Sequence, residues 1–406
     1  MSPSLHPGMA YGHDAYSPRE SPPQDDHPAS YGNEIASMAV IFNSSSQRDH
    51  SLTFDVPREI GCYSVGGKTR TYIDSPVNKR YLRADIPCKT AEINLKYGLE
   101  GRVPRDWTKS AALENLLHWV DRNRGKVMPP CSSEETQRVR PDFICSRDVL
   151  KLFLCTPYLA KDEWRVAARR IEGVVYLRNV LSKAEQDRRR GTQEGKANWS
   201  SRFRQHMVSC QRSSNVVPDK IADETQTYHA VLQSQLGTHK IIFEAEVMAV
   251  DNSQGFTKSG LNPYVEFRTC IDFDGFKKGE KYLRYKSLKW WAHARLAGAS
   301  SLVCGSCSES GMVKRIEKLQ ISDIPKKTKK FWKEEECMRF CDNVLSFIKE
   351  YVRDDERTYL FNVAMETETG HSSRRKVECR RLQNPSRIPV LPDWYLQSMV
   401  TGKSTS

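Results

Sequence analysis

Residues 239–251, HKIIFEAEVMAVD, restrict the fold of this chain more than any other stretch. Apolar and polar side chains alternate along it almost without interruption, which is the period-2 pattern of a half-buried β-strand. One face of such a strand would carry Glu244, Glu246, Met248 and Val250. The pattern therefore predicts a sheet here, with two carboxylates on the same strand face.

The remaining chain mixes strand and helix patterns. A second strand is expected at residues 263–270 (PYVEFRTC), and residues 183–199 (KAEQDRRRGTQEGKANW) are expected to form a loop. Helical patterns occupy residues 110–125, 146–159, 200–209, 281–296 and 334–352. This mixture, without an internal repeat, predicts a single large α/β (α+β) domain built on a mixed sheet.

The ends of the chain differ from this pattern. Residues 1–35 are rich in Pro, Ser, His and Asp and contain no apolar segment, so we expect a disordered N-terminal tail. The domain is expected to span residues 36–400, followed by a short tail over 401–406. No apolar run approaches the length of a membrane span, so no membrane partner is expected.

Composition constrains the partners and the compartment. The 406 residues carry a formal net charge of +13, which fits either a polyanionic partner or a merely solvated, lysine-rich surface. The twelve cysteines show no disulfide framework, which indicates a reducing compartment. The pairs Cys304/Cys307 and Cys337/Cys341 lie in apolar patterns, which favours core packing over a zinc site.

The two predicted strands carry the candidate chemistry. Glu246 lies on the first strand, and Glu266 and Arg268 share a face of the second. Carboxylates that hold magnesium against a phosphate, beside a cation, form the skeleton of a metal-dependent nuclease site. By itself this pattern is weak, because acid–x–base pairs also occur on ordinary surface strands.

Further segments narrow the choice. SRDVLKLFLCTPYLAKDEW, GVVYL, LGTHKIIFEAEV, YVEF, LRYKSLKWWAHARLAG and LPDWYLQSM occur in this order. From REIGCYS to LPDWYLQSM, nearly everything except the two tails, the chain resembles the DXO decapping exoribonuclease family, including its fungal nuclear members. The resemblance implies one α/β domain with two central mixed β-sheets flanked by helices. It also implies magnesium-dependent removal of incomplete, triphosphate or nicotinamide caps from RNA 5′ ends, in some members followed by 5′–3′ digestion.

The family's site residues are only partly retained in this sequence. Carried over by the resemblance, the arginine before TPY is Arg147, and the glutamate–hydrophobic–lysine motif becomes Glu266, Phe267 and Arg268. In the glutamate–hydrophobic–aspartate motif, Glu246 is kept but Met248 replaces the aspartate. The remaining differences are Ser200 for a glycine, Arg204 for a glutamate and His293 for a glutamine.

These replacements make the expected site three charge units more positive than the family pattern. The resemblance assigns catalytic positions to Glu246, Glu266 and Arg268, and a divalent cation such as magnesium to Glu246 and Glu266. Glu244 is in phase on the same strand and is a further candidate ligand. The candidates for contacting a substrate phosphate are Arg147, Arg204 and His293, because guanidinium groups grip phosphate through paired donors.

Two functions remain open at this stage. One is a decapping nuclease whose hydrolysis is impaired by the lost metal ligands. The other is an inactive protein that binds RNA 5′ ends or stabilises a nuclear 5′–3′ exoribonuclease, as some fungal family members do. A nuclear location, with cytoplasm as an alternative, is implied by the resemblance, and the basic stretch SSRRKVECRR at 372–381 is compatible with nuclear import.

Overall fold

The computed structural model describes most of the chain between residues 28 and 401. The described ranges are 28–40, 52–86, 92–97, 102–106, 113–129, 140–191, 199–210, 223–253, 260–271, 279–280, 282–367 and 373–401. Residues 1–27 and 402–406, which make up most of the two predicted tails, lie outside these ranges. A short helix η2 (Pro28–Tyr31) precedes the predicted domain start at residue 36, and the first strand begins two residues before it, at Glu34.

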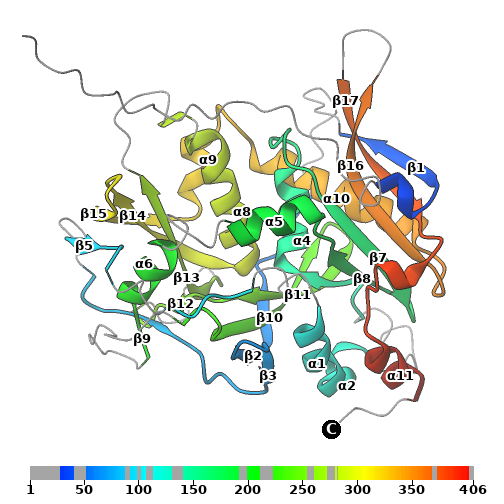
Figure 1. Ribbon diagram of the computed structural model, residues 1–406, viewed down its shortest axis with the longest axis horizontal. Helices are drawn as coiled ribbons and strands as arrows, with labels where there is room; N and C mark the ends of the chain where they lie inside the picture. Colours follow the sequence, from blue (N-terminus) through cyan, green and yellow to red (C-terminus); the bar gives the residue numbers. More distant parts are fainter. Residues whose placement is uncertain are drawn as a thin grey trace, which may run out of the picture.

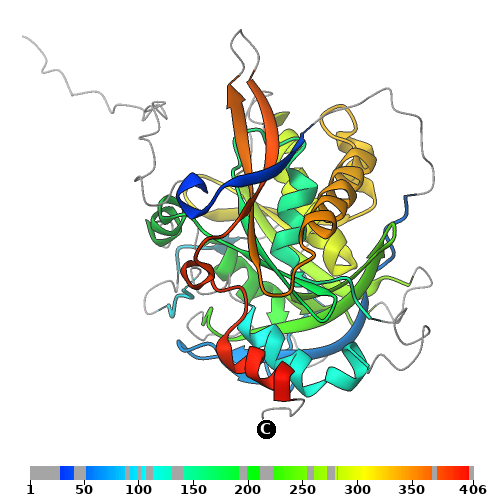
Figure 2. The same cartoon turned by 90° about the vertical axis from the view of Figure 1, so that its right-hand side faces the viewer.

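The larger sheet contains ten strands, and it is mixed because β6 pairs in parallel with both β8 and β11 while the other pairs are antiparallel. In spatial order its strands are β1 (Glu34–Ala39), β17 (Ser373–Arg381), β16 (Thr358–Thr367), β7 (Arg165–Ile171), β8 (Val174–Asn179), β6 (Phe143–Ser146), β11 (His239–Glu246), β10 (Thr227–Leu236), β2 (Arg58–Gly66) and β3 (Thr71–Ile73). Figure 2 shows the β16–β17 hairpin extending beyond the rest of the molecule.

The second sheet contains seven strands and is also mixed, because β13 pairs in parallel with β14 and β12 with β4. Its spatial order is β5 (Ile93–Asn94), β15 (Met312–Gln320), β14 (Ala299–Cys307), β13 (Asn262–Ile271), β12 (Ala249–Val250), β4 (Tyr81–Leu82) and β9 (Val208–Ser209). The predicted fold class, an α/β domain with two mixed sheets, is confirmed.

Helices cover both faces of the ten-stranded sheet (Figures 1 and 2). Phe143 and Cys145 of β6 face a core that includes α4, α8 and α10, whereas Ile144 faces α1 and α11. The helices are α1 (Glu114–Arg122), α2 (Arg124–Val127), α4 (Arg147–Cys155), α5 (Lys183–Gly191), α6 (Trp199–Met207), η5 (Tyr282–Lys286), α8 (Ser287–Ala297), α9 (Asp323–Thr328), α10 (Glu334–Tyr351), η6 (Pro385–Arg387) and α11 (Asp393–Thr401). No helix in the described ranges is long and apolar enough to cross a membrane.

Two local predictions are wrong. Residues 183–191 form the helix α5 instead of a loop, because Lys, Ala, Glu, Gln and Arg are all good helix formers. The predicted strand over residues 239–251 is two strands, because the chain leaves the first sheet after Glu246 and joins the second at Ala249. Glu246 pairs with His229 of β10, whereas Ala249 pairs with Val265 of β13.

The passage from one sheet to the other determines which residues between Glu244 and Val250 are buried. Glu244, Glu246 and Met248 are half-buried and their neighbours Ala245 and Val247 are buried, as the alternation predicts. Val250 is buried as well, so it does not share the partly polar face. Met248 therefore lies in the step between the two sheets, where strand pairing is interrupted and side chains from both sheets meet.

The cysteine pairs belong to the core. Cys304 and Cys307 lie on β14, and Cys337 and Cys341 lie on α10, and all four side chains are buried free thiols. Burial raises the pKa of Cys307 to about 12, so this thiol stays protonated at neutral pH.

Candidate functional site

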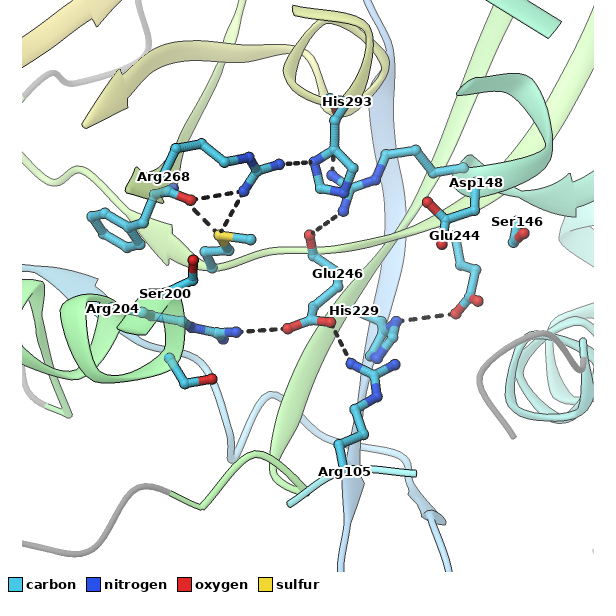
Figure 3. Close-up of a pocket in the computed structure, with 14 residues that line it drawn as sticks. Arg105, Ser146, Asp148, Ser200, Arg204, His229, Glu244, Glu246, Arg268 and His293 are labelled. Atoms are coloured by element: carbon cyan, nitrogen blue, oxygen red, sulfur yellow. Dashed lines mark hydrogen bonds and ion pairs between the residues drawn. The ribbon is translucent and has the colours of Figure 1, made fainter. Parts of the chain in front are cut away.

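A pocket with a cavity volume of about 360 Å³ opens at the step between the two sheets. We call it the inter-sheet pocket (Figure 3). It gathers nearly all the residues that the sequence singled out. Those that line it are Arg147, Ser200, Arg204, Glu244, Glu246, Met248, Phe267, Arg268 and His293. Glu266 does not line the pocket but lies directly behind it, bonded to Arg147 and close to Arg268 and His293.

Glu246, at the end of β11, is held by two arginines. Its Oε1 accepts a hydrogen bond from Arg204 Nη1 at 2.7 Å, and its Oε2 accepts one from Arg105 Nη1 at 2.6 Å. The two guanidinium groups approach the carboxylate from different sides (Figure 3). Burial opposes ionisation of Glu246, but the positive charges of Arg105 and Arg204 outweigh it and hold the pKa of the carboxyl well below its usual range.

Glu266, on β13, is enclosed by three basic side chains. Arg147 Nη1 donates to its Oε1 at 2.9 Å, while Arg268 Nη1 and His293 Nδ1 lie 3.1 and 3.0 Å from its Oε2. The side chain is only 2% exposed. Burial alone would raise the pKa of the Glu266 carboxyl, but its contacts with His293 and with the charged Arg147 and Arg268 lower the pKa by more than burial raises it, so the carboxylate is ionised.

His293, on α8, stays neutral near pH 7. Burial and the nearby charges of Arg147 and Arg268 lower the pKa of its imidazole to about 4, although Glu266 opposes this. Its Nδ1 lies 2.9 Å from Arg268 Nη2 and 3.0 Å from Glu266 Oε2, so in the neutral ring this nitrogen either accepts from the arginine or donates to the carboxylate. The histidine therefore adds no charge to the pocket.

Met248 is the residue that the sequence resemblance aligns with the family's aspartate. Its sulfur accepts weak hydrogen bonds from Phe267 N at 3.3 Å and from Arg268 Nη1 at 3.6 Å. The thioether is a soft, uncharged group, which magnesium and calcium do not select as a ligand. Met248 thus fills the step between the sheets and partners Arg268 without supplying an oxygen.

These donors do not fit a divalent cation. Magnesium, manganese and calcium take oxygen ligands at about 2.0–2.6 Å, and they need several that converge. Each oxygen of Glu246 already accepts an arginine, and Glu266 is surrounded by Arg147, Arg268 and His293. In the part of the chain that the structure describes, no group of three or more His, Cys, Asp or Glu side chains could hold a metal ion.

Glu244 belongs to a different cluster of side chains, which it forms with His229 and Tyr63. His229 Nδ1 lies 3.0 Å from Glu244 Oε2, and the hydroxyl of Tyr63 donates to the same oxygen. His229 Nε2 lies 2.9 Å from Thr227 Oγ1, and its ring stacks on Tyr63 with centroids 5.1 Å apart. Burial favours the neutral form of Glu244, but His229, Tyr63 and Arg70 lower the pKa of its carboxyl overall.

Several lining residues were not found from the sequence. Arg105 lies in a segment without periodicity, so no pattern could have placed it against Glu246. His229 could have been found, because alternation along β10 puts it opposite Glu246 in the strand pair. Asp148 follows Arg147 at the start of α4, and its carboxylate pairs with Lys151 Nζ at 2.5 Å.

The comparisons agree with the fold. A family model described as RAI1 like PD-(D/E)XK nuclease matches residues 55–396. The decapping and exoribonuclease protein of Xenopus laevis is 26% identical over 386 residues, which cover 90% of this chain and 93% of that protein.

Two solved structures share the fold. Scheffersomyces stipitis Rai1, crystallised with (3′-NADP)+ and calcium, superposes with a TM-score of 0.73 at 15% identity, covering 90% of this chain and 100% of that one. Candida albicans Rai1, in complex with pU5 and Mn²⁺, gives 0.70 at 15% identity, covering 91% and 99%. Because the family model spans more than half of the sequence, this chain belongs to the RAI1-like PD-(D/E)XK nuclease family.

Proposed function

We propose that this protein binds the 5′-phosphate end of RNA in the inter-sheet pocket and that its metal-dependent hydrolysis is impaired. The observation that carries the proposal is the double clamp on Glu246, whose two oxygens accept hydrogen bonds from Arg204 and Arg105. An acid that would hold a cation in a nuclease of this family is committed here to arginines instead.

The energies favour this assignment. Two unit charges 4 Å apart interact by about 4 kcal/mol at an effective dielectric constant near 20, and a divalent ion is repelled about twice as strongly by a guanidinium group. A millimolar metal affinity corresponds to only about 4 kcal/mol. One arginine beside Glu246 is therefore enough to cancel metal binding of that strength, and two arginines contact it.

The same arrangement suits a phosphate. Four arginines line the pocket, and the positive end of the α4 dipole opens into it at Ser146 and Arg147. Guanidinium groups that glutamates already orient lose less rotamer freedom when they grip an anion. The glutamates also compete for these donors, so we expect moderate affinity that falls with added salt.

Relatives of the chain indicate the class of ligand. The solved Candida albicans relative contains the oligonucleotide pU5, and a Schizosaccharomyces pombe relative contains 3′-FADP, both of which carry phosphates. By family likeness, the ligand of this chain is the phosphate-bearing 5′ end of an RNA.

Restoring the family acids tests the proposal. Purified protein would be incubated with 5′-triphosphate RNA and Mg²⁺ or Mn²⁺, with the Xenopus laevis relative assayed beside it. We expect little product from the wild type and a gain of hydrolysis in the Arg204→Glu, Met248→Asp variant. The control Arg204→Gln, Met248→Leu removes the positive charge without supplying acids and should stay inactive.

Wild-type hydrolysis at a rate comparable to the relative's would overturn the claim of impaired catalysis. Equal affinity for 5′-phosphorylated and 5′-hydroxyl RNA would overturn the claim of 5′-end binding. These two readouts separate an impaired enzyme from a protein without function at this pocket.

Location and a protein partner belong to the same proposal and rest on family likeness. Most of the basic stretch at 372–381 belongs to β17 (Ser373–Arg381), where Val377, Glu378 and Cys379 are buried. We propose a nuclear location and docking to a 5′–3′ exoribonuclease on that likeness alone. Co-purification of such a nuclease from nuclear extract with the tagged protein is the test.

A further inference from the structure

A basic surface flanks the inter-sheet pocket at the start of α8 and the end of α9. The two helices pack against each other in the structure, and they lie side by side in Figure 1. We call the exposed side chains that they and the adjoining residues present the α8–α9 surface. Its members are Arg284, Tyr285, Lys286, Lys327, Lys329 and Lys330.

Two of the five cations of this surface lie over one ring, and one of them, Arg284, also pairs with Glu280 at 3.3 Å. Arg284 and Lys330 both lie over Phe331, at 5.2 and 4.7 Å from its centroid, although they are far apart in the sequence. Among the described residues, no carboxylate lies within 4.0 Å of Lys286, Lys327, Lys329 or Lys330. Concentrated like charges repel one another, and a polyanion that displaces their counterions relieves the repulsion.

An aromatic side chain lies among these cations. Tyr285 is 41% exposed and belongs to η5, a π-helix none of whose side chains is buried. The helix is anchored from beneath by the edge-on contact of Tyr282 with Trp290, whose centroids are 5.1 Å apart. Exposed aromatic rings among basic groups are the platform on which single-stranded bases stack, and short π-helices recur at functional sites.

Position connects this surface to the pocket. Lys286 and His293 are seven residues apart along η5 and α8, which corresponds to about 10 Å of helix. Between them, α4 and α8 carry Lys151 and Lys289, paired with Asp148 at 2.5 Å and Asp162 at 2.7 Å. Lys289 is exposed and Lys151 half-buried, and each pairs with a carboxylate, so Lys286, on the same side of the helix as His293, is the cation that connects the surface with the pocket.

We infer that the α8–α9 surface binds the body of a single-stranded RNA whose 5′ end occupies the inter-sheet pocket. The position of the 5′ end rests on the proposed function, whereas binding of the RNA body does not. The contact is to phosphates and base faces, so it is insensitive to sequence and weakens as salt is added.

The test compares two triple variants that lose the same charge. Lys327→Gln, Lys329→Gln and Lys330→Gln together remove three charges from the surface. Lys349→Gln, Arg353→Gln and Arg357→Gln remove three from the last turn of α10 and the residues that follow it, about 27 Å from the start of that helix. Affinity for 5′-phosphorylated oligouridylates of roughly four and roughly twenty nucleotides is measured over a range of salt concentrations.

We expect the α9 triple variant to weaken binding of the long RNA, to lower its salt slope by about 2, and to leave the short RNA nearly unaffected. The α10 variant should behave like the wild type. Tyr285→Ala should weaken long-RNA binding about tenfold with the salt slope unchanged. Thermal unfolding of all three proteins verifies that they are folded.

Three results would overturn the inference. The α9 variant could bind long RNA as the wild type does, both triple variants could lose the same affinity, or the α9 variant could lose only binding of an acidic peptide such as polyglutamate. If the α9 triple variant lost affinity for long RNA to the same extent with a 5′-hydroxyl end, the α8–α9 surface would be supported. This would hold even if the pocket showed no preference for a 5′ phosphate. The experiment can therefore refute 5′-phosphate binding in the pocket without refuting RNA binding at the α8–α9 surface, and the reverse.

Discussion

Arg204 of α6 and Glu246 of β11 form an ion pair of 2.7 Å across the junction of the two sheets. Arg105 contacts the other oxygen of the same carboxylate at 2.6 Å. The carboxylate that the family likeness assigns to a metal therefore holds arginines in place, and the arginines are the groups that would meet a phosphate. A phosphate in the pocket would therefore compete with the Glu246 carboxylate for Arg105 and Arg204.

Glu246→Gln should strengthen phosphate binding. The amide cannot hold two guanidinium groups as a carboxylate does, so Arg105 and Arg204 become available to the ligand. A hydrogen bond to a charged group contributes about 1.5–3 kcal/mol, so we expect affinity for a 5′-phosphorylated oligouridylate to rise about tenfold or more. Calorimetric titration measures the affinity, and the melting temperature of the unliganded variant should fall.

Glu244→Gln is the matched control, because it makes the same change on the same strand. Glu244 is held by Tyr63 and His229 instead of by arginine hydrogen bonds, so the affinity should change little. If Glu246→Gln instead weakened phosphate binding, the carboxylate would be helping the ligand and the competition would be refuted.

Arg147 and Glu266 should be coupled in stability. Their ion pair is almost entirely buried, with side chains 5% and 2% exposed. Arg147→Gln leaves a buried carboxylate without its closest donor, and such losses cost about 3–5 kcal/mol. Urea denaturation of Arg147→Gln, Glu266→Gln and the double variant should show a double cost smaller than the sum of the single costs by about 1–3 kcal/mol. Strictly additive costs would show that the two residues do not act as a pair.

His206 should make the fold sensitive to mild acid. Burial and the charges of Arg202 and Arg83 lower the pKa of this histidine from 6.5 to about 4. The unfolded chain therefore takes up a proton between these pH values that the folded protein does not, so stability falls as the pH decreases from 6.5 to 4.

Measuring the free energy of unfolding against pH checks this. His206→Gln should lose a share of the acid sensitivity on the order of 1 kcal/mol after allowance for solvent screening. The pKa of His118 is also lowered by burial, and this residue lies on α1 away from the pocket. Its contribution to the acid sensitivity of the free energy of unfolding should therefore persist in His206→Gln. Identical pH profiles for the wild type and His206→Gln would contradict the assignment.

The sequence predicted the fold class and most elements because their patterns are local. The alternation over 239–246 and the helical spacing over 146–159 correspond to β11 and α4, and α4 ends at Cys155, just before Pro157. The motif register also brought Arg204, Met248 and Arg268 into one pocket, because short motifs on neighbouring strands and helices keep their relative places.

The remaining features depend on tertiary structure. Nothing in the alternating pattern marks the point where the chain passes from one sheet to the other, because the alternation of buried and half-buried residues continues from Glu246 through Ala249. Arg105 reaches Glu246 from a segment 141 residues away in sequence that has no periodic pattern. The pair of arginine contacts to Glu246 was therefore not visible in the sequence.

The most direct measurement is a titration with Mn²⁺ followed by electron paramagnetic resonance, which separates bound from free ion. The wild type should show no saturable binding up to millimolar Mn²⁺, and neither should Arg204→Gln, Met248→Leu. The Arg204→Glu, Met248→Asp variant should gain one saturable site. A saturable Mn²⁺ site in the wild type that disappears in Glu246→Gln would contradict the account.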